Sequence, residues 1–135
     1  MQALSDLIIE FYEKLSSWEV SVVTESGLTL PQMHTIEILG GNNLIKMKDL
    51  ATKMGITTGT LTVMIDNLEK RGLVERVPNP NDRRSYVIRL TDAGFEHYAQ
   101  HSAFHLNLVR DCTAEFTPED VEKFSALLKE FVRHI

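Results

Sequence analysis

Hydrophobic residues recur at steps of three and four along both ends of the chain, which is the period of an amphipathic helix. At the N-terminus the pattern includes Leu4, Phe11 and Trp18 and predicts one long helix that ends near Gly27. A second helix is predicted over residues 30–41, since Pro31 suits a first turn and two glycines follow the last apolar position.

Two more helices are predicted in the last third of the chain. Thr91 and Asp92 begin the first of them. The second begins at Thr117, because a threonine cap, a proline at the first helical position and an acid at Asp120 form a strong start signal.

The middle of the chain has shorter elements. A short helix is predicted over residues 48–54, and Gly55 then permits a sharp turn. Thr57 or Thr58 can cap the next helix, which Gly72 ends. The order of short helix, glycine turn and second helix predicts a helix-turn-helix.

A β-hairpin is predicted after this motif. Residues 73–77 and 86–90 have strand-forming composition, and residues 78–82 are rich in proline, asparagine and aspartate. The hairpin forms an arginine-bearing wing, and residues 42–47 form a link that can hold a very short strand. The predicted fold is therefore mainly α with a small β-hairpin wing, a winged helix-turn-helix.

The terminal helices have apolar faces that the small core of one chain cannot cover. A second copy covers them, so we expect an intertwined homodimer. The 135 residues then form a single domain. Residues 1–28 and 92–135 are expected to be dimerisation helices, and residues 30–91 the winged helix-turn-helix.

Charge is distributed unevenly along the chain. The whole sequence carries −5, but residues 44–90 hold nine basic and five acidic side chains and therefore carry +4. A basic middle between acidic arms is typical of a nucleic-acid-binding region whose arms point elsewhere.

Composition excludes several other classes. The N-terminus lacks the basic stretch of a signal peptide, no apolar run is long enough to cross a membrane, and one cysteine cannot form an internal disulfide. We therefore expect a cytoplasmic location and no membrane partner. Phosphate-binding glycine loops and nucleophile or zinc-protease motifs are also missing from the sequence, so an enzyme is not expected.

The predicted second helix of the helix-turn-helix has short polar side chains off its inner stripe. Threonine hydroxyls can bond phosphates or base edges, and threonine methyls suit thymine. Arg84 in the wing can enter a narrow minor groove, and Asp82 can hold its guanidinium. The candidate DNA-binding residues are Thr57, Thr58, Thr60, Thr62, Asn67, Lys70, Asp82, Arg83 and Arg84.

The run from residue 55 to residue 94 resembles the MarR family of winged-helix transcription regulators. The shared pattern is Leu-Glu-x-x-Gly-Leu-Val at 68–74, Asp-x-Arg at 82–84 and Leu-Thr-x-x-Gly at 90–94. The resemblance implies a homodimer on a pseudo-palindromic double-stranded operator, usually a repressor released by a ligand. It also implies groove contacts from Thr58, Thr60 and Thr62. Many members have a basic residue where this chain has Val63. A winged helix that binds a protein instead of DNA is the alternative.

Histidines form the second group of interest. His97, His101 and His105 are spaced by four on one predicted helix, so neighbouring pairs can share a metal ion. His34, His101 and His105 resemble the histidines of a site in the zinc-responsive MarR branch, for which Glu19 is the nearest glutamate.

Two other interpretations of the histidines stay open. The run of residues 33–37, Met-His-Thr-Ile-Glu, resembles the branch that represses fatty-acid synthesis genes and senses acyl chains on a carrier protein. There the histidines are hydrogen-bonded groups around an apolar pocket and hold no metal. In the third interpretation they bind no ligand at all. Cys112 is expected to be a small buried apolar residue and not a redox sensor.

Overall fold

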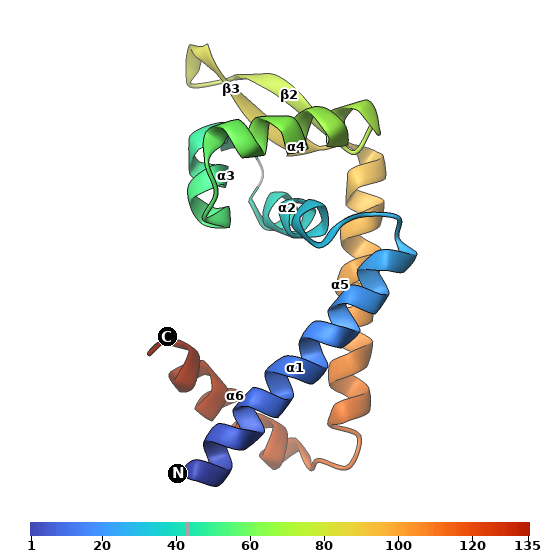
Figure 1. Ribbon diagram of the computed structural model, residues 1–135, viewed down its shortest axis with the longest axis vertical. Helices are drawn as coiled ribbons and strands as arrows, with labels where there is room; N and C mark the ends of the chain where they lie inside the picture. Colours follow the sequence, from blue (N-terminus) through green and yellow to red (C-terminus); the bar gives the residue numbers. More distant parts are fainter. Residues whose placement is uncertain (43) are drawn as a thin grey trace. The chain divides into compact units, whose positions relative to one another are not determined.

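The computed structural model describes residues 1–42 and 44–135, so residue 43 of the predicted link lies outside the described residues. Six helices and three strands lie in the described chain (Figure 1). They are α1 (Gln2–Glu25), α2 (Leu30–Gly41), β1 (Ile45–Lys46), α3 (Met47–Met54), α4 (Thr58–Lys70), β2 (Val74–Asn79), β3 (Asp82–Leu90), α5 (Asp92–Cys112) and α6 (Pro118–Val132).

The chain divides into two compact units, Met1–His101 and Ser102–Ile135. The first unit contains the predicted helix-turn-helix and wing. The mainly helical winged fold predicted from the sequence is confirmed, including the short strand β1 in the link.

Glycine and threonine shape the helix-turn-helix as predicted. Gly55 ends α3 in the left-handed region with φ 66°, a conformation that other residues adopt only with strain. Thr57 is the N-cap of α4, and its side chain accepts a hydrogen bond from the backbone N–H of Thr60. The turn between α3 and α4 is therefore three residues long, and α4 begins at a fixed point.

The three strands form an antiparallel sheet in the order β1-β3-β2. The hairpin is longer than predicted, because Pro78 pairs with Tyr86 and Asn79 with Asp82. Pro78 is tolerated because β2 is an edge strand, and the register is irregular between Pro78 and Asn79. Arg83 and Arg84 consequently lie on β3, and the turn itself is shorter than the composition indicated.

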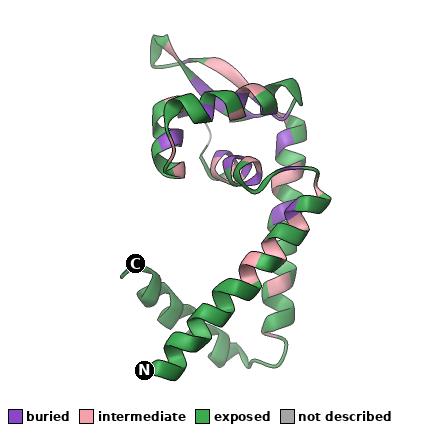
Figure 2. Cartoon of the chain, viewed as in Figure 1, coloured by how far each residue is buried: buried purple, intermediate pink, exposed green. Residues whose placement is uncertain are grey.

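The core of the first unit lies between the helices and the sheet. Figure 2 shows the buried residues gathered on α2, α4 and the strands, while the N-terminal part of α1 is exposed. The largest fully buried side chains include Ile36, Leu39, Leu50, Leu61, Ile65, Leu68 and Ile88. Because three of these belong to α4, that helix is held by one face and presents the other to solvent.

The predicted start of α6 is confirmed in detail. Thr117 and Asp120 form a reciprocal capping box, with Pro118 in the first turn. No residue described in α6 is buried, although its apolar residues follow the helical period. None of the described helices combines the length and apolar character needed to cross a membrane.

Candidate nucleic-acid interface and histidine cluster

The outer face of α4 is built from short side chains. Leu61, Ile65 and Leu68 are fully buried, which by the helical period directs the opposite face to solvent. The predicted contact residues of this helix and its cap are all exposed: Thr57, Thr58, Thr60, Thr62, Asn67 and Lys70. The structure thus brings these candidates together on one exposed surface.

Hydrogen bonds within α4 give its threonines different roles. The Thr57 hydroxyl caps the helix and also donates to Thr60 Oγ1 at 3.0 Å. The Thr62 hydroxyl donates to the backbone carbonyl of Thr58 at 2.7 Å. Thr62 therefore presents its methyl group and an accepting oxygen to solvent, whereas the hydroxyl proton of Thr60 can still be donated outward.

Two further residues lie at the centre of this outer face. Val63 is 62% exposed, so its two methyl groups face solvent. Gly59 lies one turn before it, and a Cβ at this position would meet only Thr57 Oγ1, at 3.9 Å. The helical period places Gly59 on the outer face. Sequence reasoning did not select this residue, because a glycine has no side chain that could bind a ligand.

The wing is stiffened by its own polar side chains. Asp82 Oδ1 accepts from the backbone N–H of Arg84 at 3.0 Å. The prediction that Asp82 holds the Arg84 guanidinium is wrong, because the carboxylate reaches the main chain two residues on, as aspartates in turns commonly do. Asn79, which sequence reasoning missed, is buried and supports the turn through Asn81 and Ser85.

Several basic residues of the middle segment are used inside the fold. Arg76 on β2 forms ion pairs with Asp66 at 2.6 Å and with Glu69, both on α4. The hydrogen bond that the Arg76 guanidinium donates to Asp66 Oδ1 raises the pKa of Arg76 above its ordinary value. Arg89 pairs with Glu75 across the sheet. Arg83 and Arg84 on β3 are both exposed, and among the described residues neither forms a salt bridge, so they supply the unpaired positive charge of the wing.

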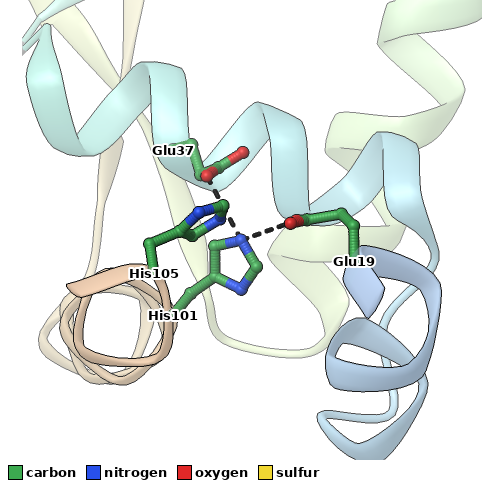
Figure 3. Close-up of side chains that lie close together, drawn as sticks. All are labelled: Glu19, Glu37, His101 and His105. Carbon is green, nitrogen blue, oxygen red and sulfur yellow. Dashed lines mark ion pairs between the residues drawn. The ribbon is translucent and has the colours of Figure 1, made fainter. Parts of the chain in front are cut away.

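A second group of polar side chains lies where α1, α2 and α5 meet in the first unit. His101 is only 2% exposed, and its Nε2 lies 2.8 Å from Glu19 Oε1 and 3.2 Å from Glu37 Oε1 (Figure 3). These three residues offer metal-ligating atoms within 4.8 Å of one another. We call Glu19, Glu37 and His101 the three-helix cluster. Sequence reasoning missed Glu37, since nothing in the spacing linked it to His101.

The other sequence candidates lie in different surroundings. His34 is exposed on α2 and does not belong to the three-helix cluster. His105 follows His101 by one turn of α5 and is partly buried. His97 Nδ1 is buried and, among the described residues, has no hydrogen-bond partner. Cys112 is exposed, so the prediction of a buried cysteine is wrong; it lies in the last turn of a helix that presents it to solvent.

Known proteins with related sequences and folds agree with this architecture. The MarR family model matches residues 28–86. The homoprotocatechuate degradative operon repressor of Escherichia coli is 28% identical over 130 residues, which cover 96% of this chain and 88% of that protein. The structural match to the crystal structure of reduced MarR from E. coli covers 95% of this chain and 95% of the MarR chain, with a TM-score of 0.73 and 28% identity.

A DNA complex has the same fold. The structural match to Streptococcus pneumoniae FabT in complex with DNA covers 98% of this chain and 95% of the FabT chain, with a TM-score of 0.83 and 23% identity. These similarities, together with the confirmed helix-turn-helix and wing, agree on one class of protein, whose members are regulators and not enzymes. The chain is therefore similar to the MarR family of winged-helix transcription regulators over residues 28–86, and its fold is similar to that of MarR itself.

Proposed function

We propose that the protein is a homodimeric repressor that reads a pseudo-palindromic DNA operator through α4 and the wing. The observation that carries the proposal is the exposed threonine-rich face of α4, which belongs to the same compact unit as the exposed arginines of β3. Such a helix fits the major groove, and a two-stranded wing reaches the neighbouring minor groove. Binding to chromosomal DNA implies a cytoplasmic location.

The side chains that contact the major groove in this proposal are short. Thr58, Thr60 and Thr62 offer hydroxyls and methyl groups, and the exposed Val63 offers two methyls to the methyl group of thymine. Gly59 lets the helix backbone approach the DNA closely, since no side chain separates them. We therefore expect an operator rich in A·T pairs at the positions under α4.

Backbone contacts fix the orientation of the unit on the duplex. The cap residue Thr57 lies at the N-terminus of α4, where free N–H groups and a partial positive charge attract phosphate. Asn67 and Lys70 extend this contact along the helix. Arg84 enters the minor groove beside Arg83, and Asp82 positions Arg84 through its backbone.

Exposed apolar side chains on the terminal helices support the dimer. On α1, Leu7 is 61% and Phe11 60% exposed, and on α6 Leu127 is 72% exposed. Apolar faces of this extent are typical of an interface. A second copy is the proposed occupant, with residues 1–28 and 92–135 as dimerisation helices around the reading region 30–91. A twofold axis then sets two reading units about 34 Å apart, one helical turn of DNA.

We infer that the effector is a metal ion. The metal hypothesis is supported by the three-helix cluster, in which a buried imidazole faces two carboxylates.

The function can be tested by selection of genomic fragments on the purified full-length protein, followed by footprinting of the enriched fragments. The expected result is protection of two half-sites separated by one helical turn, with two chains bound per operator by light scattering. A matched variant, Leu127→Glu, is expected to yield monomers and to lose high-affinity binding, whereas Lys123→Glu on the same helix retains both. Enrichment of no fragment at low salt contradicts the proposal and favours a protein-binding winged helix.

A further inference from the structure

We infer that Arg71 is a positioning residue that determines which spacing of operator half-sites the protein accepts. This role rests on the proposed function, in which α1 belongs to the dimer and α4 reads DNA. The Arg71 guanidinium donates a hydrogen bond from Nη1 to the backbone carbonyl oxygen of Gly27 at 3.0 Å, across 44 positions of sequence. The end of the recognition helix α4 is thereby tied directly to the end of α1.

The backbone around Arg71 is held in one conformation. Arg71 is the C-cap of α4, and its N–H donates to the carbonyl of Asn67. Gly72 follows in the left-handed region with φ 71°, and the N–H of Leu73 donates back to the carbonyl of Leu68. This pattern satisfies carbonyl groups of the last turn of the helix. The guanidinium of Arg71 therefore extends from a fixed point at the end of α4.

The acceptor at the end of α1 is equally well defined. Ser26 and Gly27 both donate backbone hydrogen bonds to the last turn of α1, and Gly27 has φ 74°. The neighbouring side chains of Val23 and Leu28 are buried in the core of the first unit. A Cβ at Gly27 would lie 3.7 Å from Arg71 Nη2, so the guanidinium packs against this turn as well as bonding to it.

Charge also favours this contact. The C-terminal end of a helix carries a partial negative charge, which basic side chains near that end stabilise. α1 has no basic residue in its last turn. Arg71 supplies the positive charge from α4 instead, and it forms no ion pair with any other residue that the structure describes.

A second hydrogen bond joins the next residue to the start of α5. Thr91 Oγ1 donates to the carbonyl of Gly72 at 2.6 Å, and the Thr91 N–H donates to the carbonyl of Leu73. All of these residues belong to the first compact unit. Arg71 and Gly72, which follow the last residue of α4, therefore contact the end of α1 and the start of α5, respectively.

This arrangement acts on the angle between α4 and α1. In a dimer built on α1, that angle sets how far apart the two recognition helices lie, and hence which half-site separation both can occupy at once. Arg71 lies at the opposite end of α4 from the cap residue Thr57. Because Arg71 is exposed, its hydrogen bond contributes little to folding, and its loss frees the angle more than it destabilises the fold.

The spacing preference can be measured on operator variants. Full-length wild type and Arg71→Met are titrated by fluorescence anisotropy with the footprinted operator and with versions that have one base pair added or removed between the half-sites. We expect wild type to prefer its own spacing at least about tenfold, and Arg71→Met to prefer it about threefold or less, at a nearly unchanged melting temperature. Lys48→Met is the matched control, since it removes one exposed positive charge from α3 and leaves the tie intact.

A simple contact between Arg71 and phosphate gives a different result. It weakens Arg71→Met equally at every spacing and lowers the dependence of affinity on salt, and that outcome overturns the positioning role. An unchanged preference in Arg71→Met, or an equal loss of preference in Lys48→Met, also overturns it.

Amide hydrogen exchange measures the tie without DNA. Residues 24–29 are expected to exchange at least about threefold faster in Arg71→Met than in wild type, because the end of α1 loses its anchor. Equal exchange in the two proteins overturns the tie whatever the DNA result. If wild type binds no operator at any spacing, the proposed function fails and the spacing role falls with it, whereas failure of the spacing role alone leaves wild-type binding intact.

Discussion

The guanidinium of Arg76 on β2 lies 2.6 Å from the carboxylate of Asp66 on α4, and it pairs with Glu69 one turn further along the same helix. A single side chain at the base of the wing therefore holds the recognition helix at two points. These two ion pairs also place the negative charges of Asp66 and Glu69 beside the positive charge of Arg76, which reduces the repulsion between the two carboxylates and DNA phosphate.

Replacing Arg76 with Met is expected to weaken operator binding more than it weakens the fold. The variant leaves Asp66 and Glu69 unpaired near the DNA, while half-exposed ion pairs of this kind contribute only about 1 kcal/mol to folding. Urea unfolding and fluorescence anisotropy on labelled operator measure the two effects separately.

The control for this prediction is Arg89→Met, which removes the pair with Glu75 inside the sheet and leaves α4 untouched. It is expected to lose a similar amount of stability and to keep its operator affinity. Equal losses of DNA affinity in both variants would show that Arg76 has no particular role in positioning α4.

Asp82 acts through a backbone hydrogen bond, so the shape of its side chain matters more than its charge. Asp82→Asn retains an accepting oxygen for the Arg84 N–H and is expected to bind the operator nearly as well as wild type. Asp82→Ala removes the acceptor and is expected to weaken binding severalfold, as seen in mobility shifts. A loss in Asp82→Asn as large as that in Asp82→Ala contradicts the backbone role and restores the guanidinium pairing.

Gly94 is required by close packing at the start of α5. A Cβ there would lie 2.1 Å from the backbone carbonyl oxygen of Leu73, which cannot move without disturbing the sheet. Gly94→Ala is expected to destabilise the protein by about 1–3 kcal/mol. Gly41→Ala is the control, since a Cβ at Gly41 meets nothing within 4 Å. Thermal unfolding distinguishes the two, and equal melting temperatures would disprove the packing argument.

The cap of α6 gives a pH dependence of known sign. Hydrogen bonds from Thr117 lower the pKa of Asp120 below its ordinary 3.8. A carboxyl with a lowered folded-state pKa stabilises the fold above its unfolded-state pKa, and this contribution is lost as pH falls through the lower value. Carboxyl titration by NMR is expected to give a pKa below 3.8 in wild type and a higher one in Thr117→Ala. An identical pKa in the two proteins contradicts the capping box in solution.

Local signals made most of the fold predictable. Caps and glycine stops act within a few residues, so Thr57, Gly55 and the capping box of Thr117 and Asp120 were identified correctly. The hairpin was predicted too short, because the pairing of Asn79 with Asp82 depends on the opposing strand and not on turn composition.

The sites were less predictable, because they join distant parts of the chain. The outer face of α4 follows from a single helical period. In contrast, the pairs of Arg76 with α4 and of His101 with Glu37 join residues on different elements. His34 shares α2 with Glu37, but only the rotation of that helix in the fold decides which of them meets His101.

The claim that the wing and α4 bind DNA is tested most directly by operator affinity across a salt series. Fluorescence anisotropy compares wild type with Arg84→Ala and with Lys14→Ala, which removes a positive charge from α1. Arg84→Ala is expected to weaken binding at least about tenfold and to lower the slope of log affinity against log salt by about one, while Lys14→Ala changes neither. Unchanged affinity and slope in Arg84→Ala would contradict the claim.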